Sequence, residues 1–194
     1  MRYAGGSRHR GPDMFDIDVH VRSLRQLYNE IDPSPFHERD LAPAAEDFIV
    51  GWAAEAPRNA PLRLSIHVAD EPVSDDAAAG VKGAVAGYFA ARAADARRRL
   101  RELFRRGRIS LAIGLAFLAF ALVVASLFDD RAAANPIAAI GRESLLIGGW
   151  VAMWRPLEVF LYDWWPIRAE ARRFDRLAAM PVEVRSGQRR TAPV

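Results

Sequence analysis

The sequence predicts an α+β cytoplasmic domain of the order β-α-α-β-α, followed by an α-helical transmembrane hairpin that returns the chain to the cytoplasm. Three observations support this prediction. Residues 109–128 form a run without a charged side chain, residues 97–108 before it are rich in arginine, and the first seventy residues contain two segments of alternating polarity. The apolar residues of the chain are therefore concentrated in particular segments.

The composition limits the chemistry that the chain can perform. It has 194 residues, a net charge of +3 and no cysteine, which excludes disulfides, thiolate metal sites and cysteine nucleophiles. Most of the positive charge is arginine and lies beside the apolar segments. This placement favours anionic lipid headgroups as partners and argues against a nucleic-acid surface.

The predicted cytoplasmic domain begins after a short polar segment. Residues 1–13 are rich in glycine and arginine and have no apolar core of a secretory signal, so we expect a disordered leader. In residues 15–21 the alternation of apolar and polar side chains predicts a half-buried strand. Ser23 and Gln26 have the spacing of a capping box at the start of a short helix.

The second half of this domain, which we place within residues 14–75, repeats these signals. Residues 44–55 carry apolar side chains at helical spacing, and residues 62–68 alternate as a second strand. A long basic helix should occupy residues 76–108 and continue into the first span. Two strands leave both sheet edges open, so we expect self-association. Gly80, Gly83 and Gly87 also favour it, because a stripe of such small residues lets another helix approach closely.

No catalytic or cofactor-binding motif is present. The loop that contains His37, Glu38 and Asp40 is a candidate surface for a partner, whereas His20 and His67 lie on strand faces from which they could meet. No histidine pair has metal-ligand spacing, and the sequence contains no phosphate-binding loop, dinucleotide fingerprint or nucleophile elbow. We therefore predict a protein that is not an enzyme, with no metal and no cofactor.

Residues 109–128 predict the first transmembrane helix, because about twenty helical residues span about 30 Å, the thickness of the bilayer hydrocarbon. The arginines before this helix outnumber the charges after it, which places them in the cytoplasm. We expect them to contact anionic headgroups. They are Arg97, Arg98, Arg99, Arg101, Arg105, Arg106 and Arg108.

A periplasmic loop at 129–139 and a second transmembrane helix at 140–166 should follow. Trp164 and Trp165 are typical of the cytoplasmic interface, and the basic segment 167–194 then forms a cytoplasmic tail. Both termini are thus predicted to be cytoplasmic, in a bacterial inner membrane.

The second span contains the most unusual residues. Ser144, Gly148 and Ala152 recur every four residues, as in seams where membrane helices pack closely. Arg155 and Glu158 continue this side of the helix and have the spacing of an ion pair. A span of residues 143–165 would place Arg155 near the midplane, whereas a span of 137–154 would leave it at the cytoplasmic headgroups.

Two stretches, LRQLYNEIDPSPFHERDLAPAAEDFIVGWA and IGRESLLIGGWVAMWRPLEVFLYDWWPIR, resemble a group of bacterial two-span inner-membrane proteins. The resemblance covers residues 14–177. It implies a location in the bacterial inner membrane and no particular activity.

These features lead to two functional hypotheses. The first is a self-associating membrane scaffold or accessory subunit that presents the His37 loop to a membrane or cytoplasmic protein partner. The second is a small homo-oligomeric channel or transporter in which Arg155 and Glu158 line a polar path.

Overall fold

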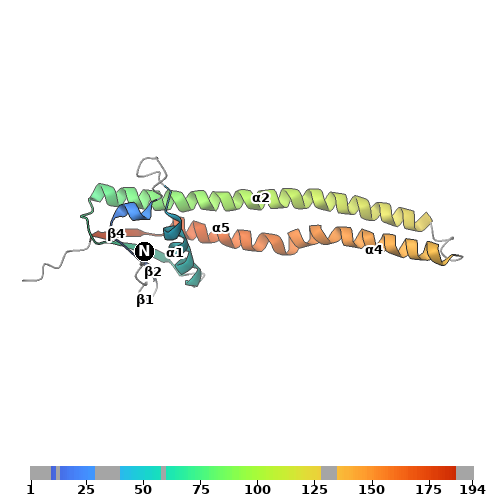
Figure 1. Cartoon of the computed structure of the whole chain (residues 1–194), viewed down its shortest axis with the longest axis horizontal. Helices are drawn as coiled ribbons and strands as arrows, with labels where there is room; N and C mark the ends of the chain where they lie inside the picture. The colour runs from blue at the N-terminus through green and yellow to red at the C-terminus, as the bar shows by residue number, and fades with distance from the viewer. Residues whose placement is uncertain (1–9, 12–13, 29–39, 58–59, 128–134, 187–194) are drawn as a thin grey trace, which may run out of the picture. The chain divides into compact units, whose positions relative to one another are not determined.

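The computed structural model describes residues 10–11, 14–28, 40–57, 60–127 and 135–186, and most of them are helical. The chain divides into two compact units. Residues 1–94 and 170–194 form the first, which we call the sheet unit, and residues 95–169 form the second, the hairpin unit. Figure 1 shows the strands of the sheet unit and the two long helices of the hairpin unit.

Three parallel strands make up most of the sheet: β2 (Met14–Val21), β3 (Leu62–Val68) and β4 (Val182–Ser186). The two-residue strand β1 (Arg10–Gly11) pairs with β2 in the antiparallel sense, so the order is β1-β2-β3-β4. The predicted β2 and β3 are confirmed to within one residue.

The prediction of a two-stranded sheet is wrong. The expected basic tail contains β4, which pairs with β3, and the expected leader contains β1. The sequence signal for β4 is the alternation of Val182 and Val184 with Glu183 and Arg185. Two apolar residues are too few to reveal a strand, and pairing with the neighbouring β3 stabilises this one.

Among the described residues between β2 and β3 there are two helical elements. The first is a 3-10 helix, η1 (Leu24–Leu27), and the second is α1 (Pro43–Glu55), which begins one residue before its prediction. The predicted capping box does not form, because Ser23 makes no side-chain cap bond and Gln26 Oε1 instead accepts from the Arg22 amide at 3.0 Å. The backbone N–H of Leu24 donates to Glu71 Oε1 at 2.7 Å.

The core of the sheet unit lies on one face of the sheet. Alternate strand residues such as Ile17, Leu64 and Ile66 are almost fully buried, together with side chains of the flanking helices. Phe89 and Phe174 stack with ring centroids 6.2 Å apart in this core. Burial of an apolar side chain of this size contributes about 1.5–3 kcal/mol.

The long helices begin and end as follows. Helix α2 (Asp75–Leu127) is continuous, as predicted, and runs from the sheet unit into the hairpin unit. The returning helical segment consists of α4 (Pro136–Glu158), the π-helix η2 (Val159–Asp163) and α5 (Trp164–Ala178). By length and composition, α2 and the whole segment Pro136–Ala178 could each cross a membrane.

Helix α4 starts four residues earlier than the predicted boundary at residue 140. The Asn135 side chain accepts the Ile137 amide at 2.9 Å, and Pro136 occupies the first turn, where its missing N–H has no cost. Further along, Pro156 removes one backbone donor, and the helix changes to the wider π form three residues later.

The order of the elements has a topological consequence. Strands β3 and β4 are neighbours in one sheet, and the connection between them contains α2, α4, η2 and α5. The two long apolar helices are therefore an insertion in the crossover between two adjacent parallel strands.

Candidate functional site

The sheet has a polar face opposite its core. The side chains that alternate with the buried apolar ones are nearly all polar from residue 16 onward, and we call this group the polar sheet face. It consists of Asp16, Asp18, His20, Arg63, Ser65, His67, Glu183 and Arg185.

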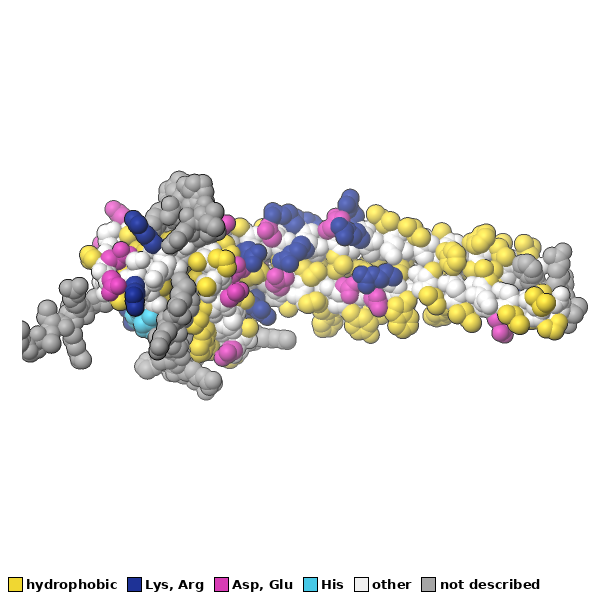
Figure 2. All heavy atoms as spheres, viewed as in Figure 1, with side chains coloured by type: hydrophobic (Ala, Val, Ile, Leu, Met, Phe, Trp, Pro, Cys, Tyr) yellow, Lys and Arg dark blue, Asp and Glu magenta, His cyan; other side chains and the backbone are white. Residues whose placement is uncertain are grey.

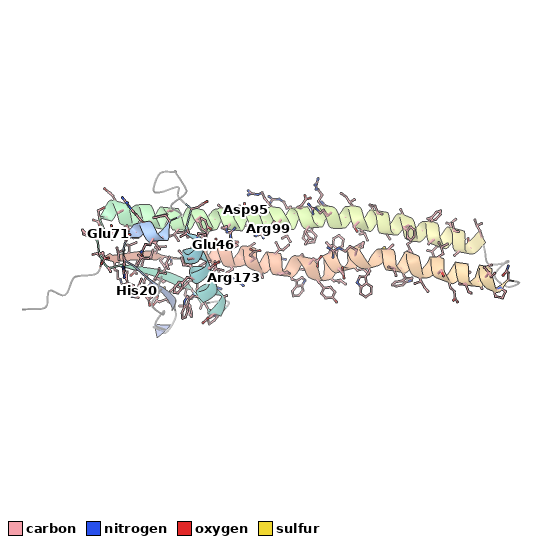
Figure 3. All side chains as sticks on the ribbon, viewed as in Figure 1. His20, Glu46, Glu71, Asp95, Arg99 and Arg173 are labelled. Carbon is pink, nitrogen blue, oxygen red and sulfur yellow. The ribbon has the colours of Figure 1, made fainter. Side chains whose placement is uncertain are left out.

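Histidines of two strands meet on this face. His20 and His67 are register partners, and their rings stack 4.6 Å apart at an angle of 13°. His67 Nε2 also lies 3.3 Å from Asp18 Oδ1. The sequence prediction that these two histidines could meet is confirmed, and Figure 3 shows His20 at the outer side of the strands.

Charges of opposite sign alternate across the same face. Arg63 Nε lies 3.7 Å from both Asp16 Oδ1 and Glu183 Oε1, and Arg185 pairs with Glu183 at 2.7 Å. The hydrogen bond from Arg185 lowers the pKa of Glu183 below its usual value. The face therefore carries charges of both signs, and its exposed members, such as His20 and Arg185, can form hydrogen bonds or ion pairs with a polar partner.

A second polar group fixes the helices of the sheet unit. Tyr88 Oη donates to Glu46 Oε2 at 2.6 Å and Arg92 Nε donates to Glu46 Oε1 at 2.8 Å, at the point where α1 meets α2 (Figure 3). The Arg92 guanidinium also lies 5.7 Å from the ring centre of Phe174. Burial, with the bond to Glu46, raises the pKa of Tyr88, and the bond to Glu46 raises the pKa of Arg92. We assign this cluster a structural role.

The predicted partner loop lies mostly outside the described residues. His37 and Glu38 are among those not described, and Asp40 is exposed just before α1. No group of three or more His, Cys, Asp or Glu within the described ranges could hold a metal ion.

The seven arginines predicted to contact lipid headgroups are all exposed on α2. Arg98 pairs with Asp95, whereas Arg105 and Arg106 both pair with Glu102, at 3.0 and 2.9 Å. Figure 2 shows dark blue Arg and Lys side chains gathered along one stretch of the hairpin unit, with magenta carboxylates among them and mainly hydrophobic side chains toward its far end.

The two helices of the hairpin unit pack at glycines. A Cβ added to Gly114 would lie 3.0 Å from the Ala152 oxygen, and one added to Gly149 would lie 2.9 Å from Leu118 Cδ1. At Gly107 the nearest atom, a Val159 methyl, would be only 2.6 Å away. The helices therefore approach so closely that no larger residue fits without a shift.

The predicted packing seam is only partly the one that closes the hairpin. Ala152 lies at the contact, but Ser144 is exposed and a Cβ on Gly148 would meet nothing within 4 Å. The buried positions are Gly149 and Pro156, seven residues apart, which is the repeat of supercoiled helices. On the first helix, Ala121 is buried at the contact and Ala112 is exposed.

Arg155 and Glu158 form the predicted pair. Arg155 Nη1 lies 3.0 Å from Glu158 Oε2 and 3.5 Å from Asp163 Oδ2, and Trp154 Nε1 donates to Glu158 at 3.0 Å. The Arg155 side chain is 67% exposed, so the pair lies on the outer surface of the hairpin unit and not between its helices. Sequence reasoning missed Asp163, because the π-helix changes the residue spacing that brings it near Arg155.

The glycine contacts also give the level of Arg155 along the hairpin. Val159 lies opposite Gly107 and Ala152 lies opposite Gly114, so Arg155 is level with Ser110 and Leu111. It is thus near one end of the apolar segment 109–128, and the middle of that segment is level with Gly149.

Comparisons with known proteins identify no relative. No family model, curated protein or solved structure matches the chain.

Proposed function

We propose that the chain is a non-enzymatic two-pass protein of a bacterial inner membrane that acts as a scaffold or accessory subunit. Its hairpin holds the sheet unit at the cytoplasmic surface, where the polar sheet face binds a protein partner. The observation that carries this proposal is the insertion of the two apolar helices between the paired strands β3 and β4.

The pairing of these strands constrains the membrane topology. Hydrogen-bonded strands lie on the same side of a membrane, so the chain between them crosses it an even number of times. Two helices of adequate length and apolarity satisfy this condition. The arginines of 97–108 favour the cytoplasm as that side, and they attract anionic lipids there.

The hairpin register bears on the boundaries of the second span. Because Arg155 is level with Ser110 and Leu111, it supports the shorter span, which begins near residue 137 and ends near residue 154. In this arrangement Arg155 and Glu158 lie at the cytoplasmic headgroups, where a charge has a lower cost than at the midplane.

The polar sheet face supports the proposal of a partner. Parallel sheets are usually covered on both faces, and apolar side chains line both. Here one face carries ordered charges and stacked histidines, which suits a polar protein surface. Self-association remains a prediction, and the glycines proposed for it, Gly80, Gly83 and Gly87, have no neighbour within 4 Å of an added Cβ.

The topology can be tested by labelling single cysteines, since the chain contains none. We expect Asp70→Cys and Ser186→Cys to react with a membrane-impermeant maleimide only after the cytoplasmic side is opened. Ala134→Cys, between the two apolar helices, should react in intact spheroplasts. Equal reactivity of all three variants would contradict the two-pass arrangement.

The scaffold function can be tested by native mass spectrometry of the protein extracted gently from its own membrane. We expect a defined complex with a second protein or with further copies of the chain. Arg185→Glu should weaken a complex that uses the polar sheet face, whereas Asp47→Arg, an equivalent charge reversal on an exposed residue of α1, should not. A strictly monomeric protein with nothing bound would overturn the proposal.

The channel remains the second candidate, based on the Arg155, Glu158 and Asp163 group. It predicts ion or proton flux in liposomes that Arg155→Leu abolishes. The register makes it the weaker candidate, because these charges are level with the end of the first apolar segment. Flux equal to that of empty liposomes would exclude it.

A further inference from the structure

Large apolar side chains continue on the second helix of the hairpin unit beyond the level where the first apolar segment ends. Leu157, Leu161, Tyr162 and Trp165 are 42, 54, 70 and 64% exposed, and we call them the aromatic strip. The strip continues the line of exposed Ile147, Trp150 and Trp154 on α4.

Three contacts place this strip beside the arginines of α2. Val159 lies opposite Gly107, and the Phe104 ring lies 6.0 Å from that of Phe160 and 6.4 Å from that of Trp164. The aromatic strip is therefore level with residues 101–108, where α2 exposes Arg101, Arg105 and Arg108. At one level of the hairpin, α2 exposes arginines, whereas the second helix exposes large apolar side chains beside the paired charges of Arg155, Glu158 and Asp163 (Figure 2).

We infer that the aromatic strip lies in the headgroup layer of the cytoplasmic leaflet, and that the hairpin tilts so that its second helix sinks deeper than its first. This inference rests on the proposed membrane insertion. The occupant of the surface is phospholipid, because the strip is continuous with the side of α4 that would face the acyl chains. Tryptophan and tyrosine are also the residues that favour this layer.

The dimensions are consistent with this placement. From residue 157 to 165 a helix rises about 12 Å. The headgroup layer on one side of a bilayer is about 5–7 Å thick. Helices packed about 9 Å apart differ in depth by about 3–6 Å when the pair tilts by about 20–40°. The thickness of the headgroup layer and the depth difference that the tilt produces add up to about the length of the strip, whereas neither is sufficient by itself.

The flanking charges mark the outer end of the strip. The Arg168 guanidinium lies 5.5 Å from the ring centre of Trp164, within reach of a headgroup phosphate. Arginines of α2 on the opposite side extend toward the same phosphates through their long apolar stems. The tilt therefore lets the aromatic strip contact lipid while the arginines at the same height on α2 contact headgroup phosphates and water.

The test uses spin labels on single cysteines in the full-length protein, reconstituted in liposomes of phosphatidylethanolamine and phosphatidylglycerol. The ratio of collisions with oxygen, which dissolves in lipid, to collisions with a water-soluble nickel complex should be severalfold higher for labels at Leu161→Cys and Trp165→Cys than for a label at Arg101→Cys, at the same level on α2. Ile147→Cys is the control for insertion and should favour oxygen.

Three results would overturn the inference. If the nickel complex reaches residues 161 and 165 as readily as residue 101, the strip lies in water. If neither reagent reaches 161 and 165 while 147 still favours oxygen, protein covers the strip and the surface is an interface. If nickel also reaches residue 147, the hairpin is not inserted and the proposed function fails as well.

Discussion

In the sheet unit the helices and strands meet through large side chains that are fully buried, among them Phe89, Ile66 and Leu177. In the hairpin unit the two helices approach closely at Gly107, Gly114 and Gly149, each of which faces an atom of the other helix where a larger residue would not fit. The large apolar residues of the hairpin, such as Phe120 and Trp150, lie on its outer surface. The same residue types therefore occupy opposite positions in the two units.

This difference is expected if, as proposed, the sheet unit folds in water and the hairpin unit lies in a bilayer. In water, removal of apolar surface is the main favourable term in folding, so large side chains belong inside. Within a bilayer the lipid tails are as apolar as leucine, so helices associate through close van der Waals packing, which small residues permit. The first two predictions below test this contrast with matched pairs of substitutions, and the last two concern the polar cluster of the sheet unit.

The largest difference in stability is expected between two substitutions of phenylalanine by alanine, one in each unit. Phe89→Ala removes a ring that is fully buried in the sheet unit and should lower the free energy of unfolding by about 3–5 kcal/mol. Phe120→Ala, at a position 59% exposed on the hairpin, should change hairpin stability by less than about 1 kcal/mol in lipid. Hydrogen exchange of the full-length protein in nanodiscs measures both, and equal losses would refute the contrast.

The adjacent glycines of α4 provide a second pair. Gly149→Val should destabilise the hairpin by about 1–3 kcal/mol, since its Cβ would lie 2.9 Å from Leu118 and 3.3 Å from Ala121. Gly148→Val adds the same atoms where nothing lies within 4 Å. Pulsed EPR between labels at Val123→Cys and Ile140→Cys should show a longer or broader distance only for Gly149→Val. A change with Gly148→Val alone would mean that the predicted seam of Ser144 and Gly148 closes the hairpin instead.

A smaller effect is expected at the polar cluster of the sheet unit. Glu46→Gln removes the charge that accepts hydrogen bonds from Tyr88 and Arg92, and should cost about 1–3 kcal/mol. Glu55→Gln, on an exposed residue of the same helix, should be nearly neutral. Hydrogen exchange of the β3 backbone amides would measure the loss of stability. Equal protection in both variants would show that the cluster adds no stability.

The smallest effect is a dependence on alkaline pH. Burial raises the pKa of Tyr88, so the folded state holds this proton more tightly than the unfolded chain, whose tyrosines titrate near pH 10. The contribution of Tyr88 to stability is complete below about pH 10 and is lost as the pH rises toward the raised value. Tyr88→Phe should remove this decline, and an unchanged decline would assign it to other groups.

The sequence alone predicted the elements whose signals are local. The strand at residues 62–68 and the helix at 44–55 were found nearly to the residue, because the period of their apolar side chains distinguishes the two structures. The apolar run of 109–128 needed only length and composition. The meeting of His20 and His67 followed from strand parity, once the two strands were assumed to be neighbours.

The tertiary structure decided the features that depend on distant pairings. Strand β4 has only two apolar residues on its inner face and forms because β3 offers it a ladder of hydrogen bonds, more than a hundred residues away in the chain. The choice of Gly149 over Gly148 depends on how two helices supercoil, and a single helical wheel does not contain that information. The level of Arg155 likewise depends on the register of two helices and on the π-helix that follows Pro156. Local periodicity thus determines which segments are helix or strand, whereas their pairing determines which surface each one presents.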